Sequence, residues 1–208
     1  MSTLQHKKRL LRKVKRNSNG GATIAWTDVY FDPVSGTYVK NTEERTSDAR
    51  IHEDLKAAFD PFAEHWMIFG EEVQEPKANH AFDGSLKGMD KVTVTSVTLS
   101  GGVTEDEEAE EDKPIGVHIQ GTKRLKCGRV KNYCCPGIKL GSPQEKYKFS
   151  AEVDAHLQSL ETEAWAYLEG KCAPPAQQAM NFDDHEGLDA EAVPIGDEDG
   201  AKLLGEAK

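Results

Sequence analysis

Positively charged side chains gather in one stretch of the chain, residues 113–149. This stretch holds nine Lys or Arg residues and a single acid, Glu145, although the whole chain carries a formal net charge of −10. Lysine binds phosphate as a point charge, and arginine can add two parallel hydrogen bonds. Aromatic rings between such cations can stack on unpaired bases, at ~1–3 kcal/mol per base. The composition is therefore typical of a surface that binds single-stranded nucleic acid.

The candidate contact residues are the cations and tyrosines around an expected hairpin and at the end of this basic stretch. They are Lys123, Arg124, Lys126, Arg129, Lys131, Tyr133, Lys146, Tyr147 and Lys148. The cations would neutralise phosphates, and the two tyrosines would stack on bases. The alternative interpretation is a solvated basic face without a ligand, which is the usual role of a surface charge cluster.

Motifs for the common catalytic reactions are absent from the sequence. There is no phosphate-binding P-loop, no dinucleotide-binding glycine pattern, no His-Glu-x-x-His and no Gly-x-Ser-x-Gly. The cysteines, Cys127, Cys134, Cys135 and Cys172, lack the C-x-x-C spacing of a zinc site. We therefore expect no enzymatic activity, no cofactor and no bound metal.

Two elements are predicted before the basic stretch. Residues 22–31 and 37–43 have the alternation and the β-branched and aromatic content of a hairpin, and Asp-Pro-Val-Ser-Gly between them favours a turn. From residue 47 to 70, large apolar side chains recur every three or four positions, as in an amphipathic helix. We expect Ser47 or Asp48 to cap this helix, and Pro61 to kink or divide it.

Three more strands and a second helix complete the predicted domain. Residues 91–100 form the clearest strand, and residues 113–125 and 129–135 form a hairpin. Ser150 is the expected N-cap of a helix that ends near Gly170. These elements predict an α+β domain over residues 22–171, in the order ββαβββα. Its antiparallel sheet has about five strands, with two helices on one face and the basic hairpin on the other.

Three polar segments accompany this domain. Residues 1–21 are predicted to form a flexible basic arm, in which residues 7–16 hold seven Lys or Arg and either contact a polyanion or stay solvated. Residues 103–112 form an acidic loop, and residues 172–208 form an acidic disordered tail. The loop could occupy the basic surface until nucleic acid displaces it. Its simpler role is to keep the protein soluble.

No apolar run approaches the ~20 residues that span a bilayer, and the N-terminus lacks the apolar core of a secretory signal. We therefore expect a cytoplasmic protein with no membrane contact.

Three segments of the chain resemble small proteins encoded by tailed bacteriophages. They are Lys91–Gly101, Ile119–Val130 and Leu160–Lys171, and the resemblance covers about two-thirds of the chain. It implies a phage origin and the host-cell cytoplasm as location, but no particular reaction. The layout of basic sheet and acidic tail is also similar to that of single-stranded DNA-binding proteins.

Two functions follow as hypotheses. The first is a non-enzymatic accessory protein that binds nucleic acid, with single-stranded DNA as ligand, in phage DNA replication or recombination. The alternative is a protein-interaction module, a phage protein that binds or inhibits a host protein through its acidic loop and tail. The acidic tail is also a candidate contact for a host or phage replication protein. The sequence leaves the oligomeric state open.

Overall fold

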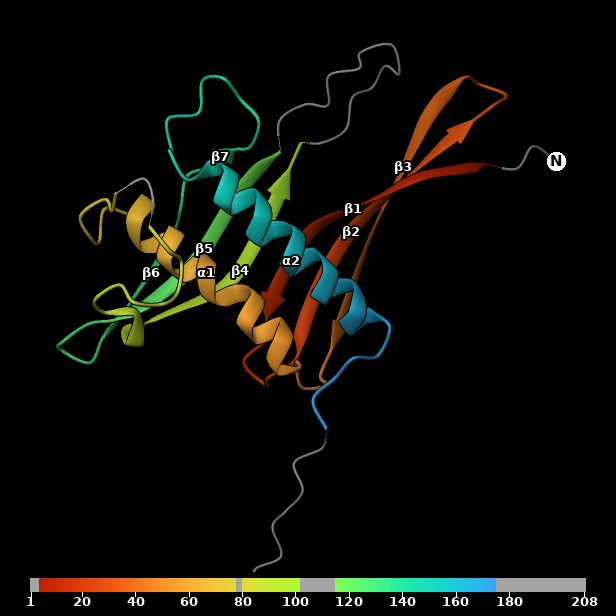
Figure 1. The fold of residues 1–208 in the computed structure, drawn as a ribbon. Coiled ribbons are helices and arrows are strands. Elements are labelled where there is room, and N and C mark those ends of the chain that lie inside the picture. Colours follow the sequence, from red (N-terminus) through yellow and green to blue (C-terminus); the bar gives the residue numbers. More distant parts are fainter. Residues whose placement is uncertain (1–3, 78–79, 102–114, 175–208) are drawn as a thin grey trace, which may run out of the picture. The chain divides into compact units, whose positions relative to one another are not determined.

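A computed structural model describes residues 4–77, 80–101 and 115–174 of this 208-residue chain. Within these ranges the chain forms one antiparallel sheet of seven strands and two α-helices, which lie on the same face of the sheet (Figure 1). The predicted α+β fold is therefore confirmed. The expected order ββαβββα is present, with one strand added before it and a short strand added before the last helix.

The strand order across the sheet is β3-β2-β1-β4-β5-β6, and β7 pairs with β5. Every neighbouring pair is antiparallel. The strands are β1 (Gln5–Arg16), β2 (Ala22–Asp32), β3 (Thr37–Ser47), β4 (Val92–Ser100), β5 (Gly116–Arg124), β6 (Val130–Cys134) and β7 (Ile138–Lys139).

The N-terminal segment lies in the middle of the sheet as β1, so the prediction of a flexible arm is wrong for residues 5–16. This strand pairs with β2 along most of its length and with β4 through residues 13–15. Its apolar Leu11 and Val14 are buried in the core. The register shifts near Lys7 and Arg12, and such bulges interrupt the alternation by which a strand is recognised in a sequence.

The two helices cover the apolar face of the sheet. They are α1 (Glu53–Phe69) and α2 (Ser150–Leu168). The predicted apolar stripe of α1 is the centre of the core, since Leu55, Phe59, Phe62 and Trp66 are at most 1% exposed. Each such side chain contributes on the order of 2–3 kcal/mol by burial, so this stripe holds α1 on the sheet.

The ends of the helices differ from the prediction. His52 caps α1 in place of Ser47 or Asp48, since its Nδ1 accepts a hydrogen bond from the backbone N–H of Asp54. The helix continues through Pro61 without a break. Ser150 is the first residue of α2 rather than its cap. Burial of the aromatic residues on both sides of Pro61 offsets the hydrogen bond that a proline removes, a loss of ~3 kcal/mol.

The folded unit extends slightly past the predicted boundary at residue 171. Cys172 forms a β-bridge with Ile51, and the backbone N–H of Ala173 donates to the carbonyl of Arg50. The predicted acidic loop, and the predicted tail from residue 175 onward, lie outside the described residues.

Trp66 determines how closely α1 approaches β5. Its indole Nε1 donates to the carbonyl of Tyr133, and its ring lies directly over Gly121. A Cβ at Gly121 would lie 2.9 Å from the indole nitrogen, closer than real side chains approach. Glycine at this position is therefore required by the packing of the helix against the sheet.

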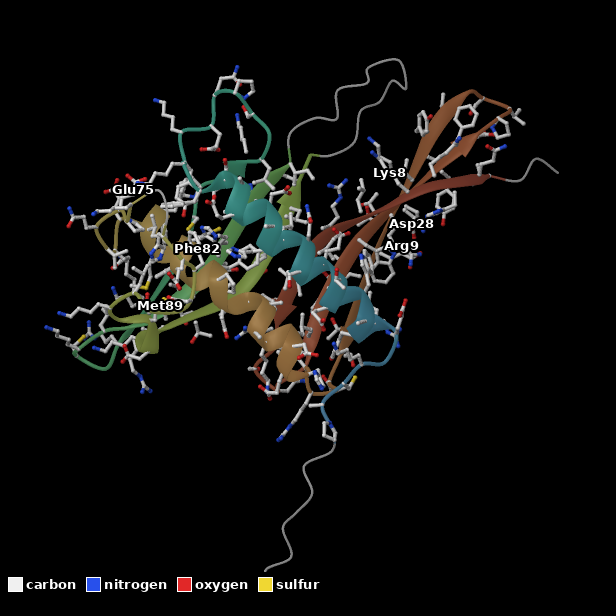
Figure 2. All side chains as sticks on the ribbon, in the orientation of Figure 1. Lys8, Arg9, Asp28, Glu75, Phe82 and Met89 are labelled. Carbon is white, nitrogen blue, oxygen red and sulfur yellow. The ribbon has the colours of Figure 1, made fainter. Side chains whose placement is uncertain are left out.

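An ion pair between Arg9 of β1 and Asp28 of β2 joins these two strands, and Arg9 also contacts α2 (Figure 2). The Asp28 carboxylate is 2% exposed. It accepts hydrogen bonds from Nε and Nη2 of Arg9, at 2.7 and 3.1 Å, and from Nε1 of Trp26 at 3.2 Å. The guanidinium lies 5.6 and 5.7 Å from the ring centroids of Trp26 and Trp165. The hydrogen bonds from Arg9 lower the pKa of Asp28 to about 2, with a smaller contribution from His6.

This depressed pKa predicts a pH dependence of stability. The stabilisation by the Asp28 carboxylate is present above its ordinary pKa of 3.8 and is lost as the pH falls through the folded value of about 2. The free energy of unfolding falls between neutral and acid pH, and Asp28→Asn should therefore make this fall smaller by up to about 2 kcal/mol. Urea unfolding of both proteins over this pH range measures the difference. Equal pH dependence in the two proteins would contradict this role of Asp28.

Candidate nucleic-acid interface

The nine residues predicted to contact nucleic acid do not form one surface. Lys123 and Lys131 are direct partners across the β5–β6 hairpin, and both bind the carboxylate of Glu72. Their hydrogen bonds lower the pKa of Glu72. Glu72 follows the last turn of α1, where its backbone N–H donates to the carbonyl of Met67. The two lysines therefore point to the helix side, and the prediction that the hairpin charges lie on the opposite face is wrong for them.

Tyr147 belongs to the core rather than to a surface. Its hydroxyl lies 2.8 Å from Nδ1 of His65, and Nε2 of the same ring lies 3.0 Å from Nδ1 of His156. Burial lowers the pKa of His65 to about 3 and raises that of Tyr147. Tyr133 packs edge-on against Trp66, with the ring centroids 5.6 Å apart. Tyr147 could stack on a base only by leaving the core.

The two lysines flanking Tyr147 lie among acidic groups. Lys148 Nζ is 3.1 Å from a carboxylate oxygen of Glu75 and donates to the carbonyl of Pro76 at 2.6 Å. Lys146 lines a cavity of about 420 Å³ to which three acidic residues also contribute, Glu71, Glu75 and Glu145. The acids would repel a phosphate group from this cavity.

Arg124, Lys126 and Arg129 remain together at the tip of the β5–β6 hairpin. The predicted turn is present: the backbone N–H of Leu125 donates to the carbonyl of Arg129, and Gly128 adopts a φ of 79°. No acid among the described residues pairs with these three cations. Of the nine predicted residues, these three are placed to meet an anionic ligand.

A second group of cations lies on the sheet face away from the helices, which we call the open face. Val14 of β1 points into the core, so Lys13 and Lys15 on either side of it point outward. Their sheet partners continue this outward row through Ser96 and Thr98 of β4. The strand register therefore assigns each residue of β1 to β5 to one face.

The open face is strongly basic. By this register, its residues on β1 to β5 include one acid, Glu44, which pairs with Lys13 at 3.1 Å. The same strands contribute seven cations to it, which are Lys7, Lys8, Arg12, Lys13, Lys15, Lys40 and Arg124.

The cations of the open face extend over small side chains. Thr27, Val29 and Ser96 are at most 4% exposed, although both helices lie on the other side of the sheet. Long basic side chains can cover such residues with their methylene groups while their charged ends reach water. Arg12 illustrates this, since it donates to Thr27 Oγ1 at 3.1 Å and to the carbonyl of Gly101 at 2.6 Å.

Aromatic rings occur at one end of the open face. Phe31 and Tyr38 are partners across β2 and β3, with ring centroids 5.3 Å apart, and both are partly exposed. The ammonium group of Lys7 lies 5.5 Å from the centroid of Phe31. The open face therefore combines cations with a pair of partly exposed rings.

The sequence marks residues 7–16 as a candidate polyanion contact, and the structure adds their conformation. As a strand with two bulges, this segment places five of its seven cations on the open face and directs Arg9 and Arg16 to the helix side. Lys40, also on the open face, was missed because it is a lone lysine in an otherwise ordinary strand. Only the register of β3 on β2 identifies its neighbours.

No protein-family model, no curated protein and no solved structure matches this chain. Among the described residues, no helix is long and apolar enough to cross a membrane. In the same part of the chain, no three His, Cys, Asp or Glu side chains gather as a group that could hold a metal ion.

Tyr147→Phe separates a structural role of this tyrosine from a binding role. The substitution removes a hydrogen bond to the buried His65 and should lower the free energy of unfolding by roughly 1–2 kcal/mol. It should leave the affinity for oligo-dT unchanged, because the ring is not on the open face. Urea unfolding and an equilibrium binding titration measure the two quantities. Weakened binding with unchanged stability would contradict the assignment.

Proposed function

We propose that this protein is a non-enzymatic accessory protein that binds single-stranded DNA on the open face of its sheet. One observation carries the proposal: β1 to β5 place seven Lys or Arg and one acid on this face, in a chain whose net charge is −10. The described residues hold 23 Lys or Arg and 20 Asp or Glu, so cations and acids are nearly balanced there, whereas the open face has seven cations and one acid.

The length of β1 suits an extended polyanion. The strand has 12 residues, so at ~3.3 Å per residue it is about 40 Å long. Its outward cations are distributed along it from Lys7 to Lys15, and Arg124 lies beyond β4 on β5. Several successive phosphates can be neutralised along this surface, with release of the counterions that they hold.

The shape of the open face favours a single strand over a duplex. Proteins read duplex DNA with a helix or a two-stranded ribbon that enters the major groove, and a sheet of this width does not fit there. Unpaired bases, in contrast, can lie across a sheet and stack on aromatic rings. Phe31 and Tyr38 offer such rings at one end of the cations.

The biological setting is also a proposal. The likeness of three sequence segments to small tailed-phage proteins supports a phage origin and the host cytoplasm as location. A role in phage DNA replication or recombination then follows from the proposed binding of single-stranded DNA. In that setting, the protein would cover single strands while other proteins act on them.

A salt titration of two charge-matched variants tests the proposed surface. Lys15→Gln/Arg124→Gln removes two open-face cations that make no ion pair with a described residue. It should weaken binding to labelled oligo-dT and reduce the slope of log K against log salt by about 1.4, since each neutralised phosphate contributes about 0.7. Fluorescence anisotropy at several salt concentrations measures both effects.

The matched control is Lys56→Gln/Lys87→Gln, which removes two cations from α1 and from the loop after it. Its affinity and slope should equal those of the wild type. Absence of binding by the wild type at micromolar protein and low salt would refute the proposed function. Equal losses in both double variants would refute the proposed surface. A labelled duplex of the same sequence should bind more weakly than the single strand.

A further inference from the structure

The outer edge of β3 is the longest bare strand edge in the described part of the chain. β3 ends the sheet and pairs only with β2, through all eleven of its residues. No described segment donates or accepts a backbone hydrogen bond along residues 38–46 on the outer side. Figure 1 shows β2 and β3 continuing past the end of the helices. Such an edge is a template for another strand.

Charged side chains usually protect a bare edge against pairing, but those of β3 complement themselves. If a second β3 lies antiparallel to the first with Thr42 opposite Thr42, Lys40 of each copy faces Glu44 of the other. The same register places Asn41 opposite Glu43, an amide donor beside a carboxylate. By two-fold symmetry each of these favourable pairs occurs twice.

Among the registers centred on residues 40 to 45, this is the one that forms opposite-charge pairs without placing like charges opposite each other. Side chains opposite each other must lie on the same face of the sheet. The two-fold axis can therefore pass through a residue position but not between two residues, because neighbouring residues lie on opposite faces. Centring the pair on Glu43 puts two like charges opposite each other. Centring it on Asn41 puts Lys40 opposite Thr42 and loses both Lys–Glu pairs. The charge pattern therefore specifies both the partner and the alignment.

We propose that two copies of this chain associate through antiparallel pairing of their β3 strands, centred on Thr42. The sheets of the two copies then form one continuous sheet. The two-fold axis is perpendicular to that sheet, so both open faces lie on the same side and form one basic surface of twice the extent. The dimer itself does not depend on the proposed function, because its contacts involve no nucleic acid.

Charge reversal followed by mixing tests this pairing. Lys40→Glu puts two acids opposite each other twice, and Glu44→Lys does the same with two lysines. Each variant alone should dissociate with a Kd roughly tenfold or more above that of the wild type. An equimolar mixture should recover the dimer, since every pair is then opposite in charge. Sedimentation velocity of the full chain, without nucleic acid, measures each mass.

Lys40→Glu leaves the intrachain Lys13–Glu44 pair intact, and circular dichroism confirms that each variant is folded. Lys87→Glu, with the same charge change away from β3, should remain a dimer. A monomeric wild type, charge variants that dimerise like the wild type, or a mixture that stays monomeric would each overturn the proposal.

A disulfide tests the register independently. The two-fold axis brings residue 42 of one copy opposite residue 42 of the other, at a separation that a disulfide can bridge. Thr42→Cys, in a chain whose exposed Cys127 and Cys134 are replaced by Ser, should form a covalent dimer on mild oxidation. Thr46→Cys in the same background should not, since it faces residue 38. If the Thr42→Cys variant sediments as a dimer but forms no disulfide on oxidation, this alignment is overturned.

Discussion

The structure depends on a central strand whose two faces have opposite requirements. On one face of β1, Leu11 and Val14 pack under the helices. On the other face, cations project into water without a covering element among the described residues. The apolar pair fixes the strand in the middle of the sheet, and this position aligns the cations. A flexible arm with the same sequence would hold the same charges without any order.

Placing so many like charges on one strand costs electrostatic energy, and the surrounding residues offset part of it. Asp28 binds Arg9 on the helix side, and Glu44 binds Lys13 on the open face. Arg16 stacks on Phe59, with 4.3 Å between the guanidinium carbon and the ring centroid. The compensation is stronger on the helix side, where burial strengthens each interaction. The open face keeps the larger share of uncompensated charge, and a polyanion would relieve it.

The elements with a clear period could be predicted from the sequence. The apolar stripe from Leu55 to Trp66 identified α1, and the alternation in residues 92–100 identified β4. Two features of the structure could not be inferred from the sequence. The bulges in β1 hide its alternation, and the pairing of Lys123 and Lys131 with Glu72 joins positions more than fifty residues apart. A local excess of cations therefore indicated a basic hairpin, although part of its charge is already neutralised.

The central claim is that single-stranded DNA binds to the open face. Mapping the amide and methyl signals of isotope-labelled protein by NMR, during titration with a short oligo-dT, tests it most directly. The account predicts that shifts concentrate on outward residues of β1 and its neighbours, such as Lys15, Thr98 and Gln120, and continue to the hairpin tip. Shifts concentrated on α1 and α2, or no shifts with oligo-dT in excess, would contradict it.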